Sequence, residues 1–210
     1  MARSTDNSRT RLLGATIDLV RSQGYAATRV EDVCAAAGVT KGSFFHHFAS
    51  KEDLAIAAAG LWDERASALF SPELPYRAAE SAVDRLLGYI AYRRELLAGE
   101  LWEWSCYAGT AIQEVHETHP RIRNACAQSI ENHLAGLRAL VDDALTERPV
   151  AGLDSASLAI HFQAVIQGAF VLAKARQARQ AAVDALDHLH RYVEMLFTHS
   201  TTRKNSRRLP

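Results

Sequence analysis

The sequence contains few of the residues that cross-link or break a chain. Its 210 residues include only three cysteines, five prolines and 11 glycines. So little proline and glycine excludes a collagen-like or low-complexity chain, and we expect an ordinary globular protein. The cysteines, Cys34, Cys106 and Cys126, are odd in number, far apart and without C-x-x-C spacing. They are therefore more typical of reduced thiols in the cytoplasm than of a disulfide framework.

Long apolar runs and a net charge are also missing. The longest apolar stretch, residues 55–62, is far below the roughly 20 residues of a membrane helix, so we expect no membrane span. The polar first residues lack the apolar core of a secretory signal, which favours the cytoplasm. A formal net charge of zero excludes a uniformly basic protein.

The charges are nevertheless unevenly distributed. Residues 1–51 hold seven Lys/Arg against four Asp/Glu, whereas residues 52–200 hold thirteen against twenty. A basic N-terminal part on an acidic body is typical of a chain that meets a polyanion, although chance gives the same pattern. A second basic group, Arg203–Arg208, is expected to be a solvated end rather than an additional DNA contact.

Helix-forming residues dominate, and no sustained alternation of apolar and polar residues predicts a sheet. The fold class is therefore all-α, with about nine helices and without internal repeats. Apolar spacing, caps and breakers place them at 9–23, 28–37, 41–48, 51–70, 76–97, 99–118, 120–147, 154–178 and 181–198.

The second and third predicted helices are joined by a tight turn. Thr28 is the expected N-cap of the second helix, with Glu31 three residues later as in a capping box. Gly38 ends that helix, and Thr40 caps the next. Phe44 and Phe48 are expected to pack in the core. This arrangement predicts a helix-turn-helix over about 28–48, whose second helix can enter the DNA major groove.

The other side of that helix carries hydrogen-bond donors suited to phosphates and base edges, namely Lys41, Ser43, His46 and His47. Gly42 has two interpretations, a close approach of the backbone to DNA or a weak helix start.

The segment TRVEDVCAAAGVTKGSFFHHFASKEDL, residues 28–54, resembles the DNA-binding segment of TetR-family transcriptional regulators. The resemblance implies a three-helix DNA-binding domain at 8–66 and a C-terminal ligand-binding and dimerisation domain at 76–199. It further implies a homodimeric repressor that releases palindromic double-stranded operator DNA when a small molecule acts on the C-terminal domain. By position, it assigns DNA contacts to Thr28, Thr40, Lys41, Gly42, Ser43, Phe45, His46, His47 and Lys51. Phe45 stands where tyrosine is usual, so the contact there is expected to be apolar.

The C-terminal part supplies aromatic residues for a cavity, and we expect an apolar or aromatic effector. The candidate ligand-binding residues are Trp102, Cys106, Tyr107, Phe162, Phe170 and Lys174. If Lys174 approaches Cys106, the thiol becomes a sensor of electrophiles; an inert, buried thiol is the alternative.

The last two predicted helices are expected to form the dimer interface as a four-helix bundle. The candidate residues are Ala159, Ala164, Ile166, Val183, Leu186, Val193 and Leu196. His116 and His119 offer only two ligands, so no metal is assigned, and no cofactor is expected. The sequence contains no catalytic motif of the hydrolase, zinc-peptidase or nucleotide-binding types, so we do not expect an enzyme. A DNA-binding dimer without a small-molecule effector is the alternative.

Overall fold

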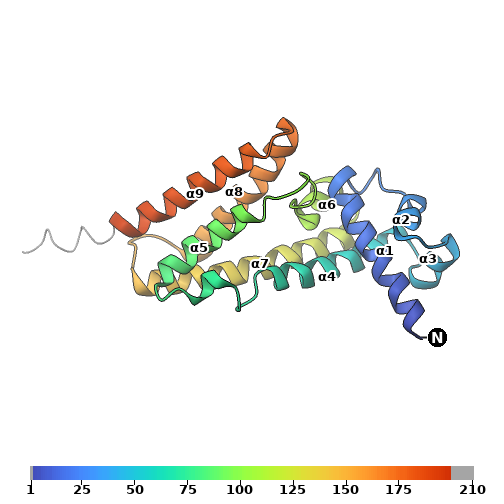
Figure 1. Cartoon of the computed structure of the whole chain (residues 1–210), viewed down its shortest axis with the longest axis horizontal. Coiled ribbons are helices and arrows are strands. Elements are labelled where there is room, and N and C mark those ends of the chain that lie inside the picture. Colours follow the sequence, from blue (N-terminus) through green and yellow to red (C-terminus); the bar gives the residue numbers. More distant parts are fainter. Residues whose placement is uncertain (1, 200–210) are drawn as a thin grey trace, which may run out of the picture. The chain divides into compact units, whose positions relative to one another are not determined.

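The computed structural model describes residues 2–199, and the side chains of residues 8–198. The basic group at 203–208 lies outside the described residues. Over the described range the chain is all-α, with nine α-helices, one 3-10 helix and no strand (Figure 1). The helices are α1 (Ala2–Gln23), α2 (Val30–Ala37), α3 (Lys41–His47), α4 (Lys51–Leu69), η1 (Pro75–Ala78), α5 (Ala82–Glu95), α6 (Tyr107–Val115), α7 (Pro120–Glu147), α8 (Ser155–Arg176) and α9 (Gln180–His199).

Several helix boundaries follow the predicted signals. The Ser50 and Asp154 side chains each accept a backbone N–H three residues later, from Asp53 at 3.0 Å and from Ser157 at 2.7 Å. Pro120 is the first residue of α7, where its missing N–H costs nothing.

Two predicted helices are shorter than expected. The helix predicted at 76–97 begins only at Ala82, because the Ser81 hydroxyl caps it after the separate turn η1. The helix predicted at 99–118 is helical only from Tyr107 to Val115. Before it, Gly99 has a φ of 79° and the Glu103 carboxylate accepts the Glu100 N–H, so the chain turns there.

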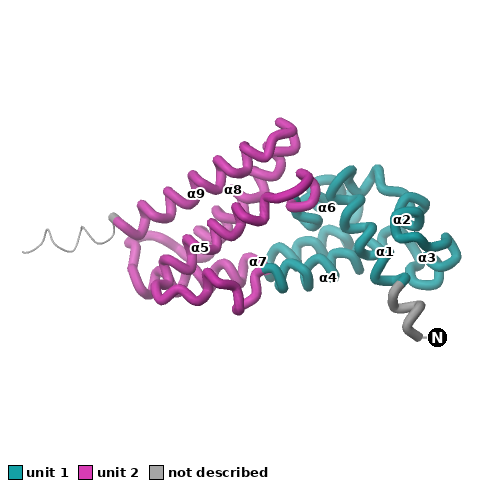
Figure 2. Tube along the Cα trace, viewed as in Figure 1, with its two compact units in different colours: residues 1–69, 105–132 teal, residues 70–104, 133–210 magenta. Residues whose placement is uncertain are grey.

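The chain forms two compact units (Figure 2). Unit 1 comprises residues 1–69 and 105–132, and unit 2 comprises residues 70–104 and 133–210. Helix α6 and the first part of α7 thus pack with the N-terminal helices, because Tyr107, Ala108, Ala111 and Val115 share the core of α1 and α4. The division into domains at 8–66 and 76–199 stays a prediction. The compact units are grouped differently, since each contains two separate stretches of the chain.

Unit 2 is built from α5, η1, α8, α9 and the second part of α7. Helix α9 packs on both α8 and α5. Among the described residues, one helix, α8, is long and apolar enough to cross a membrane by length and composition alone. Within the protein 44% of this stretch is buried, and a single helix of this kind is weak evidence for a membrane span.

The residues predicted for the dimer interface are mostly buried within the protomer. Ala159 and Ile166 on α8, and Val183, Leu186 and Val193 on α9, are 8 % exposed or less, since their helix faces pack against the rest of unit 2. This corrects the choice of residues, because a side chain covered by its own chain cannot face a partner. Ala164 is exposed and Leu196 half-buried. The exposed large apolar side chains of these helices are Ile160, Val171, Leu172, Tyr192 and Met195.

Candidate nucleic-acid interface

The turn between α2 and α3 has the geometry that the sequence predicts. Gly38 lies in the left-handed region at φ 61° and ψ 42°. The Gly38 N–H donates to the Ala35 carbonyl and the Val39 N–H to the Cys34 carbonyl, at 3.1 and 3.0 Å, which satisfies the last carbonyls of α2. The Thr40 hydroxyl accepts the Ser43 N–H at 3.1 Å and starts α3. The turn is thus fixed by hydrogen bonds at both helix ends.

One face of α3 fastens the helix to unit 1. Phe44 is completely buried and Phe48 nearly so, and their rings lie 6.0 Å apart between centroids. They belong to the core cluster that contains Leu12, Ile17 and Leu54, which confirms the predicted packing. Burying two phenylalanines contributes several kcal/mol, so α3 is a rigid part of unit 1.

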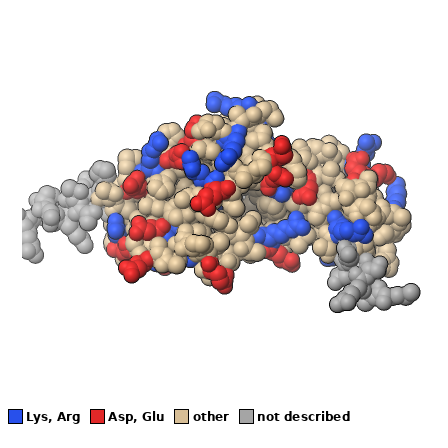
Figure 3. Space-filling model, in the orientation of Figure 1, with Lys and Arg blue, Asp and Glu red and all other residues tan. Residues whose placement is uncertain are grey.

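The opposite face of α3 is open to solvent. Lys41, Gly42, Phe45 and His46 are exposed, and Ser43 is half-buried. Phe45 stands out because a large apolar ring is 56 % exposed. Figure 3 shows basic side chains on the visible surface of unit 1, which carries these helices. An exposed aromatic ring among donors suits a DNA groove, where thymine methyls and sugars offer apolar contacts.

Gly42 needs no special space within the protein. A Cβ atom built there would meet only the Thr40 hydroxyl, at an ordinary 3.8 Å. The protein interior therefore gives no reason for glycine, and both interpretations stay open, a close approach of the backbone to DNA or a weak helix start.

Lys41 is paired on the surface with Glu31 of α2. The ammonium donates to the Glu31 carboxylate at 2.6 Å, and both side chains are exposed. This hydrogen bond raises the pKa of Lys41 and lowers the pKa of Glu31. A phosphate that approached Lys41 would therefore have to compete with this carboxylate.

His47 and Lys51 are less free than the sequence implies. His47 Nε2 lies 2.8 Å from the Ser8 hydroxyl of α1, and burial lowers the pKa of its imidazole. The Lys51 ammonium donates to the Tyr25 carbonyl at 2.7 Å and lies 4.1 Å from the centroid of the Tyr25 ring. Partial burial lowers the pKa of Lys51. Both residues tie neighbouring segments of unit 1 together.

Thr28 differs most from the expectation. Helix α2 begins at Val30 with Arg29 as its N-cap residue, and the Asp32 carboxylate accepts the Arg29 N–H at 3.1 Å. Thr28 is 1 % exposed, and its hydroxyl donates to the Gly24 carbonyl at 2.7 Å. Thr28 is therefore not the cap that the sequence predicts, and its side chain stabilises the loop between α1 and α2.

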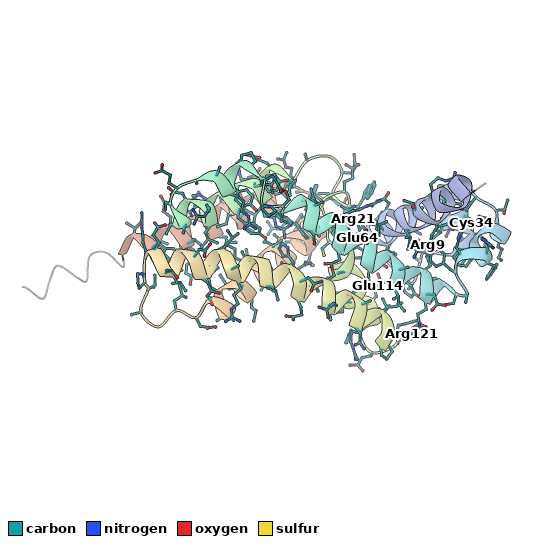
Figure 4. All side chains as sticks on the ribbon, turned by 90° about the horizontal axis from the view of Figure 1, so that it is seen from below. Arg9, Arg21, Cys34, Glu64, Glu114 and Arg121 are labelled. Carbon is teal, nitrogen blue, oxygen red and sulfur yellow. The ribbon has the colours of Figure 1, made fainter. Side chains whose placement is uncertain are left out.

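Sequence reasoning missed two charged side chains that hold unit 1 together (Figure 4). The Glu114 carboxylate of α6 accepts the N–H groups of Tyr25 and Ala26, at 3.1 and 2.9 Å. Arg121, in the first turn of α7, donates to Glu52 and Asp53 at 3.1 and 2.9 Å. No local pattern signals these contacts, because each joins residues more than 65 positions apart.

A neighbouring arginine of α1 was also missed. The Arg11 guanidinium donates to the Gly38 carbonyl at 3.4 Å, which supports the turn from the side of α1.

The candidate effector residues are divided between the units. In unit 1, Cys106 is the N-cap of α6, with its sulfur accepting the Gly109 N–H at 3.3 Å. The buried Tyr107 donates its hydroxyl to the Ala55 carbonyl at 2.9 Å. Trp102, Phe162, Phe170 and Lys174 belong to unit 2, where Phe170 lies against Trp104 with centroids 5.5 Å apart. The effector assignment, including the pairing of Cys106 with Lys174, stays a prediction.

Two family models match separate stretches of the chain. Residues 12–58 match the family model described as bacterial regulatory proteins, tetR family. Residues 82–189, about half of the chain, match the model described as tetracyclin repressor-like, C-terminal domain. The chain belongs to the TetR family. Members of this family are transcriptional regulators and not enzymes.

Curated relatives of this TetR-family chain match over limited stretches. The HTH-type transcriptional regulator CymR of Pseudomonas putida is 43% identical over 47 residues, which cover 22% of this chain and 23% of CymR. The HTH-type transcriptional repressor KstR2 of Rhodococcus jostii (strain RHA1) is 29% identical over 124 residues, which cover 51% of this chain and 60% of KstR2. The match thus spans less than two thirds of either relative.

A solved structure matches over nearly the whole length. A TetR transcriptional regulator from Chloroflexus aurantiacus J-10-FL superposes with a TM-score of 0.79 and 26% identity, covering 91% of this TetR-family chain and 96% of that protein.

Proposed function

We propose that this TetR-family chain is a homodimeric transcriptional repressor that binds palindromic operator DNA through α3. The observation that carries the proposal is the two-faced α3. Phe44 and Phe48 fix one face to the core, while Lys41, Gly42, Phe45 and His46 face outward. Such a helix can enter the major groove without disturbing its own packing. The similarity to KstR2, named as a repressor, supports repression.

The dimer would form through the exposed face of α8 and α9. Ile160, Ala164, Gly168 and Leu172 follow one another at helical spacing on the outer side of α8, and all four are exposed. The small residues let a partner helix come close to the backbone. On α9, Tyr192 and Met195 are exposed large apolar residues, and the Tyr192 ring contacts His161 of α8 with centroids 5.4 Å apart. A twofold axis through this face would bury it and present two copies of α3 to adjacent grooves.

The effector would act by shifting a population of conformations. DNA would favour the spacing in which both copies of α3 fit the grooves, and a small apolar or aromatic molecule in unit 2 would favour another. The aromatic side chains of unit 2, with Phe162 fully buried, support such a ligand. Membership of the TetR family also favours a cytoplasmic protein.

Fluorescence anisotropy on the DNA that flanks the protein's own gene tests the proposal, with random DNA as the control and several salt concentrations. We expect specific binding by two protomers, with an affinity that falls as salt rises. Binding equal to that of random DNA, by protein shown to carry no bound small molecule, would contradict the proposal.

A separate measurement tests the dimer. Leu172→Glu places a charge in the exposed stripe and is expected to shift the protein from dimer to monomer in sedimentation equilibrium, without loss of helicity. The matched control is Arg138→Glu, a change at an exposed position of α7 outside the stripe. Unchanged dimerisation of Leu172→Glu would place the interface elsewhere.

A further inference from the structure

Unit 2 contains a cluster of cationic and aromatic side chains that the proposed DNA surface does not use. It is centred on Tyr89 and Arg93 of α5 and His133 of α7. The Arg93 Nε donates to the Tyr89 hydroxyl at 3.0 Å, and Arg93 Nη2 lies 3.1 Å from His133 Nε2. The Tyr89 hydroxyl lies 2.9 Å from the same nitrogen. These three polar groups therefore form one connected network.

Aromatic rings surround this network. The Arg93 guanidinium lies 4.4 Å from the centroid of the Phe70 ring. The same Phe70 ring contacts Tyr92 and His133, at 6.0 and 5.0 Å between centroids. On another side, Tyr89 contacts the buried ring of Phe162 at 6.4 Å. The surroundings thus suit the apolar body of a small molecule.

The cluster carries positive charge without a protein counter-charge. Neither Arg77 nor Arg93 forms an ion pair with a carboxylate within the described part of unit 2, and both contribute to the electrostatic environment of the Tyr89 hydroxyl. His133 is neutral near pH 7, because burial and the charge of Arg93 lower its pKa to about 3. It therefore leaves the charge of the cluster unchanged. A partly buried guanidinium without a carboxylate is the usual setting for binding an anion.

The hydrogen bonds of Arg93 leave one edge of its guanidinium available. Nε hydrogen-bonds to the Tyr89 hydroxyl and Nη2 to His133 Nε2, both on one edge of the guanidinium. The opposite edge, formed by Nη1 and the second Nη2 hydrogen, has no partner among the described residues. An edge of this kind, with two parallel N–H groups, can bind a carboxylate in a bidentate manner.

Two further polar atoms of the same region are buried without a partner. They are the Tyr76 hydroxyl and Arg77 Nε. The Tyr76 ring contacts Tyr89 and Tyr92, at 6.2 and 5.7 Å, which places it beside the network. Gly88 makes this possible, because a Cβ there would lie 2.7 Å from Tyr76 Cβ. Buried donors without acceptors call for a group that the protein itself does not provide.

We propose that this cluster binds the carboxylate of an apolar or aromatic acid, with Arg93 as the bidentate anchor and the rings of α5 and η1 holding the body of the molecule. This deepens the proposed function, on which it rests, by naming the chemical class of the effector. Uncharged aromatic compounds would leave the guanidinium without its counter-charge.

Isothermal titration calorimetry on the full-length dimer tests the proposal with matched pairs of probes. The acids are benzoate, phenylacetate, 2-naphthoate and octanoate, and each is compared with its own primary amide. We expect at least one acid to bind saturably and at least about tenfold tighter than its amide. Absence of binding by all four acids, or equal binding of acid and amide, would overturn the proposal. Equal binding of inorganic phosphate would also overturn it, because any oxyanion would then serve.

Variants connect the preference to Arg93. Arg93→Met is expected to abolish the preference for acid over amide, and Arg93→Lys, which keeps the charge but loses the fork, to reduce it. The matched control is Arg138→Gln, which removes an exposed arginine of α7 paired with Asp142. An undiminished preference in Arg93→Lys, or any preference in a folded Arg93→Met, would contradict the assignment.

Operator binding, measured on the same preparations without acid, separates the two proposals. Intact DNA binding together with a failed acid preference would refute this inference alone, whereas loss of specific DNA binding in the parent protein would refute the proposed function.

Discussion

Replacing Gly42 by alanine separates stability from DNA binding. The added methyl group would lie 3.8 Å from the Thr40 hydroxyl, so the folded protein accommodates it without strain. Alanine is favoured over glycine in a helix by up to about 1 kcal/mol, and less in a first turn. For a protein of this size that amounts to an increase in Tm of about 1–4 °C. The variant should therefore be at least as stable as the parent.

The same methyl group should weaken operator binding. Gly42 is exposed at the start of α3, where the proposed DNA surface lies. A methyl group between backbone and DNA in close contact separates the two surfaces, and we expect the affinity to fall about tenfold, or about 1.4 kcal/mol. Anisotropy at fixed salt measures the affinity, and differential scanning calorimetry measures the Tm.

Gly60→Ala provides the matched control. Gly60 lies in α4, is exposed, and a Cβ there meets nothing within 4 Å. This variant should gain similar stability and keep its affinity for the operator. If Gly42→Ala binds the operator as tightly as Gly60→Ala, the backbone of α3 does not approach DNA and glycine there reflects only a weak helix start.

Three further predictions concern single charged or titratable groups. Glu31→Gln should tighten DNA binding because it releases Lys41 from its ion pair. Lys41→Ala should weaken DNA binding and reduce the slope of log affinity against log salt by about 1. Unchanged binding of both variants would exclude Lys41 from the interface. Because the pKa of His133 is about 3 in the folded protein and higher in the unfolded chain, the unfolded chain binds more protons between about pH 3 and 6.5. The stability that this group contributes is complete above about pH 6.5 and should fall with decreasing pH by up to about 1.4 kcal/mol per unit. His133→Gln should flatten this dependence in urea unfolding, and an unchanged slope would mean that the pKa of His133 is not lowered in the folded protein. Glu114→Ala removes the acceptor of two backbone N–H groups and should lower the free energy of unfolding by about 1–2 kcal/mol. The control is Glu117→Ala, at an exposed position of the same region. Equal stability of the two variants would show that water replaces the Glu114 carboxylate.

The local features of the DNA-binding unit could be predicted from the sequence because they depend on neighbouring residues. Gly38 ends α2 and Thr40 caps α3 through hydrogen bonds that span three to five positions. Phe44 and Phe48, one helical turn apart, identify the inner face of α3. Such patterns require no knowledge of the rest of the chain.

Features that depend on distant residues could not be predicted in this way. The sequence predicts Thr28 as the N-cap of α2, but the fold buries Thr28, whose hydroxyl donates to the Gly24 carbonyl, and the helix begins after Arg29. The apolar spacing of α9 correctly indicates a packed face, but spacing alone does not show whether the same chain or a partner chain covers that face. The contacts of Glu114 with Tyr25, and of Arg93 with His133, join segments that only the fold brings together.

In the proposed complex two copies of α3 bind successive major grooves of one DNA site, and protection of guanine N7 from methylation reports on both grooves. On the DNA bound in the anisotropy assay, we expect two protected major-groove segments that are related by inverted symmetry and centred about one helical turn, or somewhat more, apart. Lys41→Ala should weaken both equally. A single protected segment, or protection confined to adenine N3 in the minor groove, would show that two copies of α3 do not bind successive major grooves.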